Sequence, residues 1–293
     1  MKVVLMGSRG HVAKPLTDIL VSKGIDTTVI TRSEDNAKLI RESGATAAVG
    51  SGFDKEFLTK TFRDADCVFV LLAGDIFLAD ALDQMIKQDT VICDAILESA
   101  VENVVYLSSI GSDSPDLGFH YYCEEVVKKK LGGLRSVVFV RPTGFFTNLF
   151  NYMSTLKSQK AIYSNSPRNQ VLTFVHPDDI AKVCADLILT PELKEKFKII
   201  GVESDRADAV ELEKLFSDAL GTDIKYITIS DDDALAGFMK LGITKENGKK
   251  VINFYSDKYH NEAIANVNKH TNVIGTHKLA DYLKTDFVPV YNS

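Results

Sequence analysis

The sequence is poor in residues that form covalent or metal cross-links. It has four cysteines in 293 residues, and no two of them have the C-x-x-C spacing of a metal or redox site. Each cysteine (Cys67, Cys93, Cys123, Cys184) lies in an apolar stretch, which is typical of reduced thiols in a protein core. We therefore expect no disulfide framework, no metal site and a reducing, cytoplasmic setting.

Long apolar runs and runs of positive charge are also missing. No apolar run reaches the roughly 18 residues that a transmembrane helix needs, and the apolar start at residues 1–7 is too short for a secretory signal. The chain has 34 Lys and Arg against 40 Asp and Glu, a net charge of −6, without a basic run. These features predict no membrane segment and give no sign of a nucleic-acid partner.

The first half of the chain alternates short apolar runs with helical patterns. Uninterrupted apolar strands separated by helices predict a parallel sheet covered on both faces, with right-handed connections, that is, a doubly wound α/β fold. The predicted strands are 3–6, 27–30, 45–49, 67–72, 104–107 and 137–140, and the longest predicted helix runs from about residue 76 to 100.

The pattern changes after about residue 150, and no repeat, low-complexity segment or Pro-rich linker marks the change. Strands become sparse and helices dominate. The predicted strands are 198–200 and 225–229, and the predicted helices are 209–220, 231–241 and 247–259. We expect a first domain over residues 1–150 and a smaller, mostly helical lobe over 151–293, with the chain returning to the first domain near 170–200.

A glycine-containing loop joins the first predicted strand to the first predicted helix. Its sequence is Gly7-Ser8-Arg9-Gly10-His11-Val12-Ala13, a G-x-x-G-x-x-A pattern. Glycine lets backbone N–H groups approach a pyrophosphate, and the helix N-terminus favours the anion. A strand before the loop and a helix after it are the context that such a motif requires, although a plain strand–helix turn would also fit. We predict a Rossmann domain that binds a dinucleotide through Gly7, Ser8, Arg9, Gly10, His11 and Val12.

The residue after the second strand indicates which dinucleotide is bound. An NAD site usually has a carboxylate there for the ribose 2′-OH, whereas an Arg accommodates a 2′-phosphate. Arg32 stands at this place, and Glu34 and Asp35 come later, as first-turn helix residues. We predict NADP(H), with NAD(H) as the alternative; Arg9 could add a second guanidinium.

At four places the chain resembles the NmrA-like branch of the atypical short-chain dehydrogenases. The matches are the glycine loop, Val104–Ser109, Arg141–Asn148 and Thr173–Ala181, the last containing Phe-Val-His-Pro-Asp-Asp-Ile-Ala. The resemblance implies a Rossmann domain, NAD(P)(H) in its crevice and a small C-terminal substrate lobe. It leaves the reaction open, because members range from quinone, dye and phenylpropanoid reductases to redox-sensing regulators without turnover.

The catalytic pair of the wider superfamily is absent. That chemistry uses a Ser and a Tyr-x-x-x-Lys pair, but Glu125 follows Tyr121 at this spacing. NmrA-like reductases more often carry a Lys or His four residues before a Glu, and His120 and Glu124 fit the His form. An alignment shifted by one residue puts Tyr121 in that place instead. Our catalytic candidates are His120, Ser108 and Tyr121; the alternative for His120 is a helix-start residue in solvent or packed under the lobe.

The remaining candidate contacts lie where predicted strands end. Ligands of open α/β sheets bind outside the carboxyl ends of the strands, so one crevice under the lobe is expected. Further cofactor contacts are predicted at Leu72, Ala73, Ser108, Pro142 and Phe145. Outside this crevice we predict that Asp179 caps a helix, that His176 joins the two domains, and that His260, His270 and His277 are surface residues without metal spacing.

Two functions of different classes remain open at this point. The first is an NADPH-dependent reductase of a small quinone-like, aromatic or conjugated carbonyl substrate, in which the cofactor carries the chemistry. The second is a non-catalytic NADP(H)-binding redox sensor that acts through a protein partner, which the missing Tyr-x-x-x-Lys pair favours.

Overall fold

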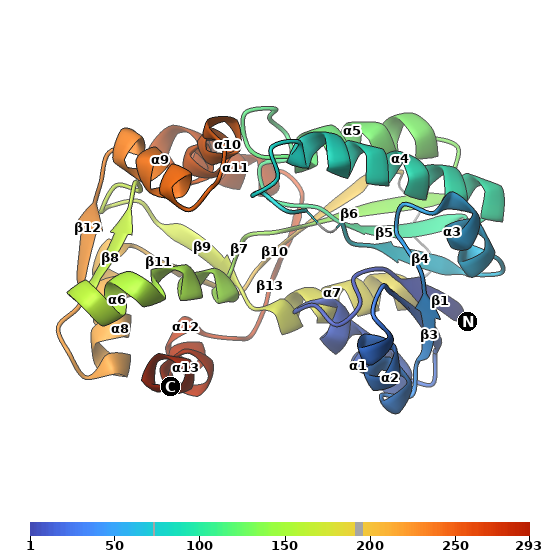
Figure 1. Cartoon of the computed structure of the whole chain (residues 1–293), viewed down its shortest axis with the longest axis horizontal. Helices are drawn as coiled ribbons and strands as arrows, with labels where there is room; N and C mark the ends of the chain where they lie inside the picture. The colour runs from blue at the N-terminus through green and yellow to red at the C-terminus, as the bar shows by residue number, and fades with distance from the viewer. Residues whose placement is uncertain (73, 191–195) are drawn as a thin grey trace.

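A computed structural model describes residues 1–72, 74–190 and 196–293. Its centre is an eight-stranded, wholly parallel sheet in the order β13-β10-β6-β5-β4-β1-β2-β3 (Figure 1). The fold is therefore a doubly wound α/β fold, as predicted. The strands of this sheet are β1 (Lys2–Leu5), β2 (Asp26–Thr31), β3 (Thr46–Val49), β4 (Cys67–Val70), β5 (Asn103–Leu107), β6 (Ser136–Pro142), β10 (Lys198–Glu203) and β13 (Thr271–Ile274).

Helices cover both faces of the sheet (Figure 1). Because successive strand residues point to opposite faces, an uninterrupted apolar strand supplies two cores at once. In β4, for example, Val68 packs into one core and Phe69 into the other. One face carries α3 (Lys55–Phe62), α4 (Ala81–Ser99) and α5 (His120–Leu131), and the other carries α1 (Ala13–Ser22), α2 (Glu34–Glu42) and α7 (Pro177–Leu189).

The lobe has a third core of its own, which includes Phe216 and Phe287. It contains two small sheets, β11-β9-β7 and β12-β8, which were predicted only at residues 225–229. Its strands are β7 (Gly144–Phe145), β8 (Ala161–Ser164), β9 (Leu172–Val175), β11 (Asp205–Ala207) and β12 (Lys225–Thr228). Its helices are a 3-10 helix (Phe146–Tyr152), α6 (Met153–Gln159), α8 (Ala209–Leu220), α9 (Asp231–Lys240), α10 (Lys245–Tyr255), α11 (Asp257–Val267), α12 (Leu279–Tyr282), a π-helical turn (Leu283–Phe287) and α13 (Val288–Asn292).

Two predicted helices have different limits in the structure. The helix expected from about residue 76 starts at Ala81, because the Asp75 side chain accepts the Phe77 N–H and forms a turn before it. The helix expected over 247–259 is two helices, since Ser256 is extended (φ −69°, ψ 145°) and separates α10 from α11. Of the segments after residue 150, α7 packs on the central sheet and β10 and β13 are strands of it; the return of β13 was not predicted.

None of the helices within the described residues combines the length and the hydrophobicity needed to cross a bilayer. The four cysteines are all buried free thiols.

Candidate cofactor and active site

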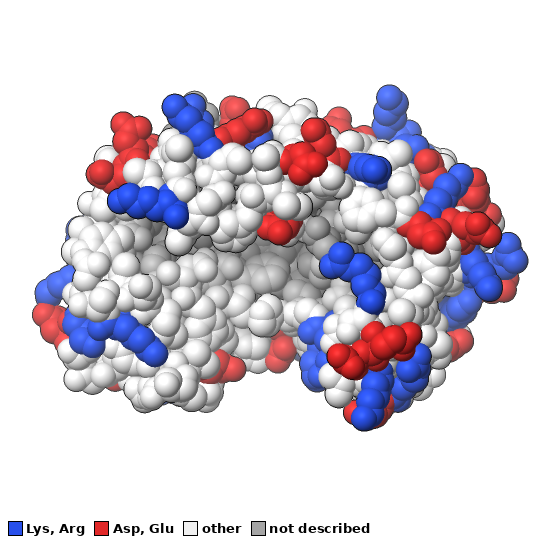
Figure 2. Space-filling view, in the orientation of Figure 1, with Lys and Arg blue, Asp and Glu red and all other residues white. Residues whose placement is uncertain are grey.

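The carboxyl ends of the central strands face the lobe across a hollow. Figure 2 shows this hollow between the two halves, lined mostly by uncharged side chains, with charged residues gathered on its rims. All eight strands are parallel, so the loops that follow them meet at this edge. A ligand of the sheet is expected there.

A cavity of about 620 Å³ opens at this edge. The loops after β1, β2, β3 and β4 and the start of α4 form its wall. Its lining residues include Gly7, Ser8, Thr31, Arg32, Gly50, Gly52, Phe53, Gly74, Asp75, Leu78, Gln84 and Gln88. Of the predicted cofactor residues, the structure brings Gly7, Ser8 and Arg32 to this wall.

The glycine loop has the backbone that a pyrophosphate site needs. Gly7 has φ +107°, and a Cβ there would lie 3.2 Å from the Cβ of Ala13, so both small residues are needed. No described side chain caps the first turn of α1, and that turn carries no acidic residue. Lys14 donates its N–H to the Gly10 carbonyl and Pro15 has no N–H, so this turn offers an anion chiefly the positive end of the helix dipole. The residues present fit a dinucleotide phosphate.

Arg32 is exposed at the end of β2, where it lines the cavity. The carboxylates that follow belong to α2: Ser33 caps that helix by accepting the Asn36 N–H, and Glu34 and Asp35 are in its first turn. The edge of the cavity after β2 thus has a guanidinium and no carboxylate.

Other predicted cofactor residues lie away from the cavity wall. Val12 and Leu72 are buried in the two cores, and Ser108, Pro142 and Phe145 lie at the exits of β5 and β6. Arg9, Gly10 and His11 belong to the glycine loop, and Ala73 lies outside the described residues. Sequence reasoning missed Gly50, Gly52, Gln84 and Gln88. The Gly-Ser-Gly sequence after the third strand could have indicated Gly50 and Gly52. The structure shows why Gly50 is a glycine, since a Cβ there would overlap the Phe57 ring.

Ser108 belongs to a polar cluster below the exits of β5 and β6, which we call the Glu124 network (Ser108, Asp113, Glu124, Arg141) and which is buried except at Asp113. Arg141 donates to both carboxylate oxygens of Glu124, from Nε at 2.8 Å and from Nη2 at 2.7 Å. The Ser108 hydroxyl donates to Glu124 Oε1 at 2.6 Å, and Arg141 Nη1 lies 2.8 Å from Asp113. Burial alone would lower the pKa of Arg141, but Glu124 and Asp113 outweigh it and raise that pKa. The Ser108 proton is therefore engaged with Glu124.

His120 is the first residue of α5, one turn before Glu124. Its Nδ1 atom is buried and has no hydrogen-bond partner in the described part of the chain. Burial lowers the pKa of His120 to about 4, although the nearby Glu124 opposes this shift. The ring is therefore neutral at pH 7, so it can donate or accept a hydrogen bond but does not carry an acidic imidazolium. Tyr121, the residue of the shifted alignment, is half-buried, with its ring edge-on to Tyr122 at 5.2 Å.

A second polar cluster joins α7 to the chain after β13; we call it the Asp179 joint (His176, Asp179, Ser204, His277). The predicted roles of its first two members are exchanged. His176 is the helix cap, accepting the Asp178 N–H at its Nδ1 atom. Asp179 is the joining residue, accepting from the Ser204 hydroxyl at 2.6 Å and from the backbone N–H groups of Thr276 and His277.

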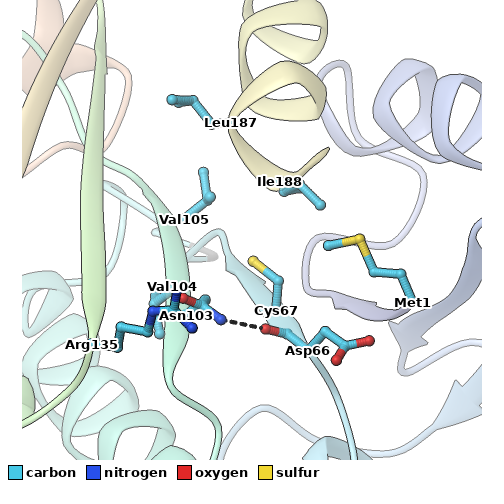
Figure 3. A pocket seen from close by; sticks show the side chains of 9 residues that line it. All are labelled: Met1, Asp66, Cys67, Asn103, Val104, Val105, Arg135, Leu187 and Ile188. Carbon is cyan, nitrogen blue, oxygen red and sulfur yellow. Dashed lines mark hydrogen bonds between the residues drawn. The ribbon is translucent and has the colours of Figure 1, made fainter. Parts of the chain in front are cut away.

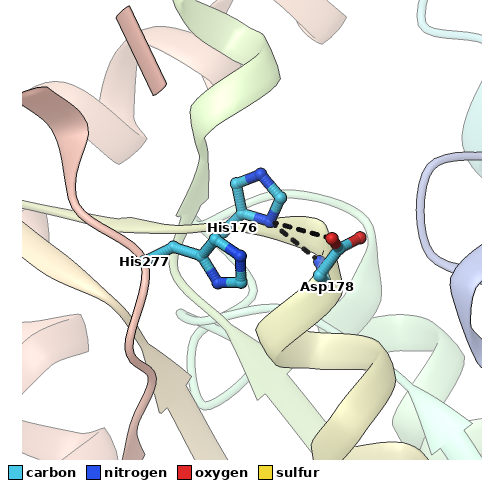
Figure 4. Close-up of side chains that lie close together, drawn as sticks. All are labelled: His176, Asp178 and His277. Carbon is cyan, nitrogen blue, oxygen red and sulfur yellow. Dashed lines mark hydrogen bonds and ion pairs between the residues drawn. The ribbon is translucent and has the colours of Figure 1, made fainter. Parts of the chain in front are cut away.

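The histidines of the joint are stacked, with ring centroids 4.0 Å apart, and Asp178 lies beside them (Figure 4). These three side chains could together ligate a metal ion. However, the Nδ1 lone pair of His176 faces the Asp178 N–H, and Nδ1 of His277 lies 3.0 Å from a carboxylate oxygen of Asp179. Parallel rings cannot both hold one ion in their planes. The arrangement thus favours a structural joint.

His277 is partly exposed and His270 is exposed, but His260 is buried beside Phe254, contrary to its expected surface position.

A further cavity, of about 440 Å³, lies at the opposite edge of the sheet, between the amino ends of β4 and β5 and the end of α7 (Figure 3). Cys67, Val105 and Ile188 are among its lining residues. Asn103 donates to the Asp66 carbonyl and Asp66 accepts the Lys2 N–H, while the amide oxygen of Asn103 is buried without a hydrogen-bond partner in the described residues. We assign the candidate site to the carboxyl edge, because ligands of open α/β sheets bind at the carboxyl ends of the strands.

Comparison with known proteins gives the same fold and a family. Pinoresinol reductase 1 of Arabidopsis thaliana is 22% identical over 269 residues, 84% of this chain and 83% of that protein. The triphenylmethane reductase of Citrobacter sp., solved with NADP(H), has a TM-score of 0.73 at 15% identity and covers 97% of this chain and 96% of its own.

An NADPH-dependent quinone oxidoreductase of Escherichia coli, solved with NADPH, has a TM-score of 0.74 at 15% identity, covering 97% of this chain and 99% of its own. A family model described as the NmrA-like family matches residues 1–272. The chain thus belongs to the NmrA-like family.

Proposed function

We propose that this protein is an NADPH-dependent reductase whose cofactor occupies the 620 Å³ cavity. The observation that carries this proposal is the pairing of an uncapped α1 N-terminus with Arg32, and no carboxylate, after β2. The relatives with NADP(H) or NADPH in their names support the same cofactor. The buried free thiols support a reducing, cytoplasmic location.

The residues around the cofactor bind, orient and exclude water. NADPH bound in the cavity would supply a hydride. The loop after β1 would hold the phosphates through backbone N–H groups, and Arg32 would pair with the 2′-phosphate. Ser108, held by Glu124, would fix the end of β5 at the crevice, with no free hydroxyl proton to transfer.

The proposed substrate class follows from the lack of a strong proton donor among the candidate catalytic residues His120, Ser108 and Tyr121. His120 is neutral at pH 7, Ser108 is engaged, and the sequence has no Tyr-x-x-x-Lys pair at this helix. We therefore propose small conjugated acceptors, quinone-like or aromatic, whose hydride adduct is stable enough to take its proton from water. The lobe after residue 150 would supply the walls that select among them.

The same observations favour a second candidate, an NADP(H)-binding redox sensor without turnover. A site whose histidine is neutral and whose serine hydroxyl is engaged is compatible with cofactor binding without catalysis. Such a sensor would act through a protein partner, whereas the reductase would need only a small-molecule substrate.

The cofactor assignment is tested by Arg32→Ala. We expect NADPH binding to weaken about tenfold or more, the effect of losing a charge-assisted hydrogen bond, with NADH nearly unchanged. Isothermal titration calorimetry measures both affinities. Arg41→Ala, an exposed arginine at the end of α2, is the control. Equal weakening of both cofactors would show that Arg32 does not read the phosphate.

The reaction is tested by NADPH oxidation against a panel of quinones, cationic dyes and conjugated carbonyls. We expect turnover, with a change of no more than about tenfold in His120→Gln, because a neutral imidazole only positions the substrate. NADPH binding without turnover of any acceptor would replace the reductase by the sensor.

A further inference from the structure

Helix α10 of the lobe forms hydrogen bonds with the two loops that follow β4 and β5. Asn247 donates through its Nδ2 atom to the carbonyls of Ile76, at 3.0 Å, and Leu78, at 2.9 Å. Asn253, on the same helix, donates to the Asp116 carbonyl at 3.1 Å. Residues some 170 positions apart are thereby joined at the carboxyl edge of the sheet.

The segment held by Asn247 is a wall of the cofactor cavity. Gly74, Asp75 and Leu78 line that cavity, between the end of β4 and the start of α4. Ile76 packs against the core, but Phe77 is 54% exposed and Leu78 is 47% exposed. The other hydrogen bonds of the segment within the described residues are local, from the Phe77 and Leu78 N–H groups to Asp75 and from the Ala81 N–H to the Leu78 carbonyl. The Asn247 carboxamide thus supplies the two hydrogen bonds by which α10 of the lobe holds this wall.

Asn247 is itself held firmly. It is 3% exposed, and its N–H donates to the hydroxyl of Thr244, the cap of α10. The next residue, Gly248, packs so closely on α9 that a Cβ would lie 2.8 Å from Leu235. A carboxamide NH₂ offers two donors, and here both are directed to carbonyls of one turn.

We propose that Asn247 is a positioning residue for the cofactor: it fixes the 75–78 turn as the wall of the dinucleotide cavity and so makes cofactor binding depend on the lobe. The proposal rests on the proposed function for the identity of the ligand. It acts through the turn, because the turn, and not Asn247, lines the cavity.

The test uses Asn247→Asp in the full chain. Aspartate keeps the size of the side chain and suits the first turn of a helix, but it turns two donors into acceptors that face two carbonyls. The control is Asn253→Asp, the same change on the same helix, which breaks the bond to the other loop. Circular dichroism and thermal unfolding verify that both variants fold.

The first readout is hydrogen exchange without ligand. Asn247→Asp should speed the exchange of amides 75–80 and not those of 112–117, and Asn253→Asp should do the reverse. The second readout is NADPH affinity, followed by nicotinamide fluorescence, to which a chain without tryptophan adds no indole signal. We expect about tenfold weaker NADPH binding in Asn247→Asp. With any acceptor that the protein reduces, the KM for NADPH should rise while kcat stays nearly constant.

Unchanged exchange at 75–80 in Asn247→Asp would overturn the proposal, as would faster exchange with unaltered NADPH affinity. If the wild-type chain does not bind NADPH, the proposed function falls, and the cofactor role of Asn247 falls with it. The exchange experiment without ligand would still decide whether Asn247 holds the turn.

Discussion

The Glu124 network and the Asp179 joint each connect a helix to the ends of strands through a carboxylate, but the donors to the two carboxylates differ. In the first, a fully buried carboxylate meets a buried guanidinium in a two-bond pair between α5 and β6. In the second, Asp179 accepts one hydroxyl and two backbone N–H groups, and its histidine neighbour His277 is 42% exposed.

The difference shows how the charge of its partners sets the energetic consequence of breaking a buried polar contact. Breaking one partner of a buried ion pair leaves an uncompensated charge in a low-dielectric interior. At the joint, Asp179 is only 4% exposed and Ser204 1%, so what differs is the charge of the partners. Neutral donors to Asp179 leave no opposite charge unpaired when the carboxylate is removed.

The largest effect is expected from Arg141→Met. The substitution leaves Glu124 buried with Lys128, 3.4 Å away, as its remaining cation within the described residues. The free energy of unfolding should fall by about 3–5 kcal/mol. Urea unfolding at pH 7.5 measures it, with Arg41→Met as an exposed control. The double variant Arg141→Met/Glu124→Met should recover most of the loss, and a loss below about 1 kcal/mol in the single variant would remove the contrast between the two clusters.

A smaller effect is expected from pH at His120, beside the Glu124 network. The native pKa is about 4 and the unfolded value is near 6.5, so the unfolded chain binds the proton first as the pH falls. The stability that comes from burying His120 as neutral imidazole is therefore fully present above pH 6.5 and is lost as the pH falls to 4. His120→Phe removes it and should exceed the wild-type stability at pH 5 by about 2 kcal/mol more than at pH 7.5.

This comparison has to be made between proteins at one pH. Burial raises the pKa of Asp89 to about 7, so its contribution has the opposite sign: stability from this group is lost as the pH rises from about 4 to 7. Asp89 is common to wild type and His120→Phe and cancels in their difference. An equal pH slope in the two proteins would show that His120 is not buried as neutral imidazole.

The smallest effect is expected from Asp179→Asn at the joint. Burial alone would raise the pKa of Asp179, but the hydrogen bonds from Ser204 and His277 outweigh it and lower that pKa. Asparagine keeps the shape and one acceptor, so the free energy of unfolding should fall by only about 1 kcal/mol. Hydrogen exchange should quicken at residues 271–278 and not in β5 or β6. A loss as large as that of Arg141→Met would mean that the joint behaves as a buried ion pair.

The amino-acid sequence by itself determined the first six strands of the central sheet, the glycine loop and the place of Arg32. Apolar strands and capped helices are encoded in short windows, and β1 to β6 lie where their apolar runs predict. Gly7 and Ala13 are six positions apart, so their close approach is local information as well. The same holds for Ser33 as the cap that assigns Glu34 and Asp35 to α2.

Only the tertiary structure decided which polar side chains meet. Glu124 and Arg141 are 17 positions apart, Ser204 reaches Asp179 across 25, and Asn247 reaches Ile76 across 171. No local pattern fixes such pairs, because each depends on where two separately formed elements pack. For the same reason Ser108 and His120 were identified by position but not by chemical state. The carboxylate of Glu124 engages the hydroxyl of Ser108. Burial keeps the ring of His120 neutral, against the effect of the same carboxylate.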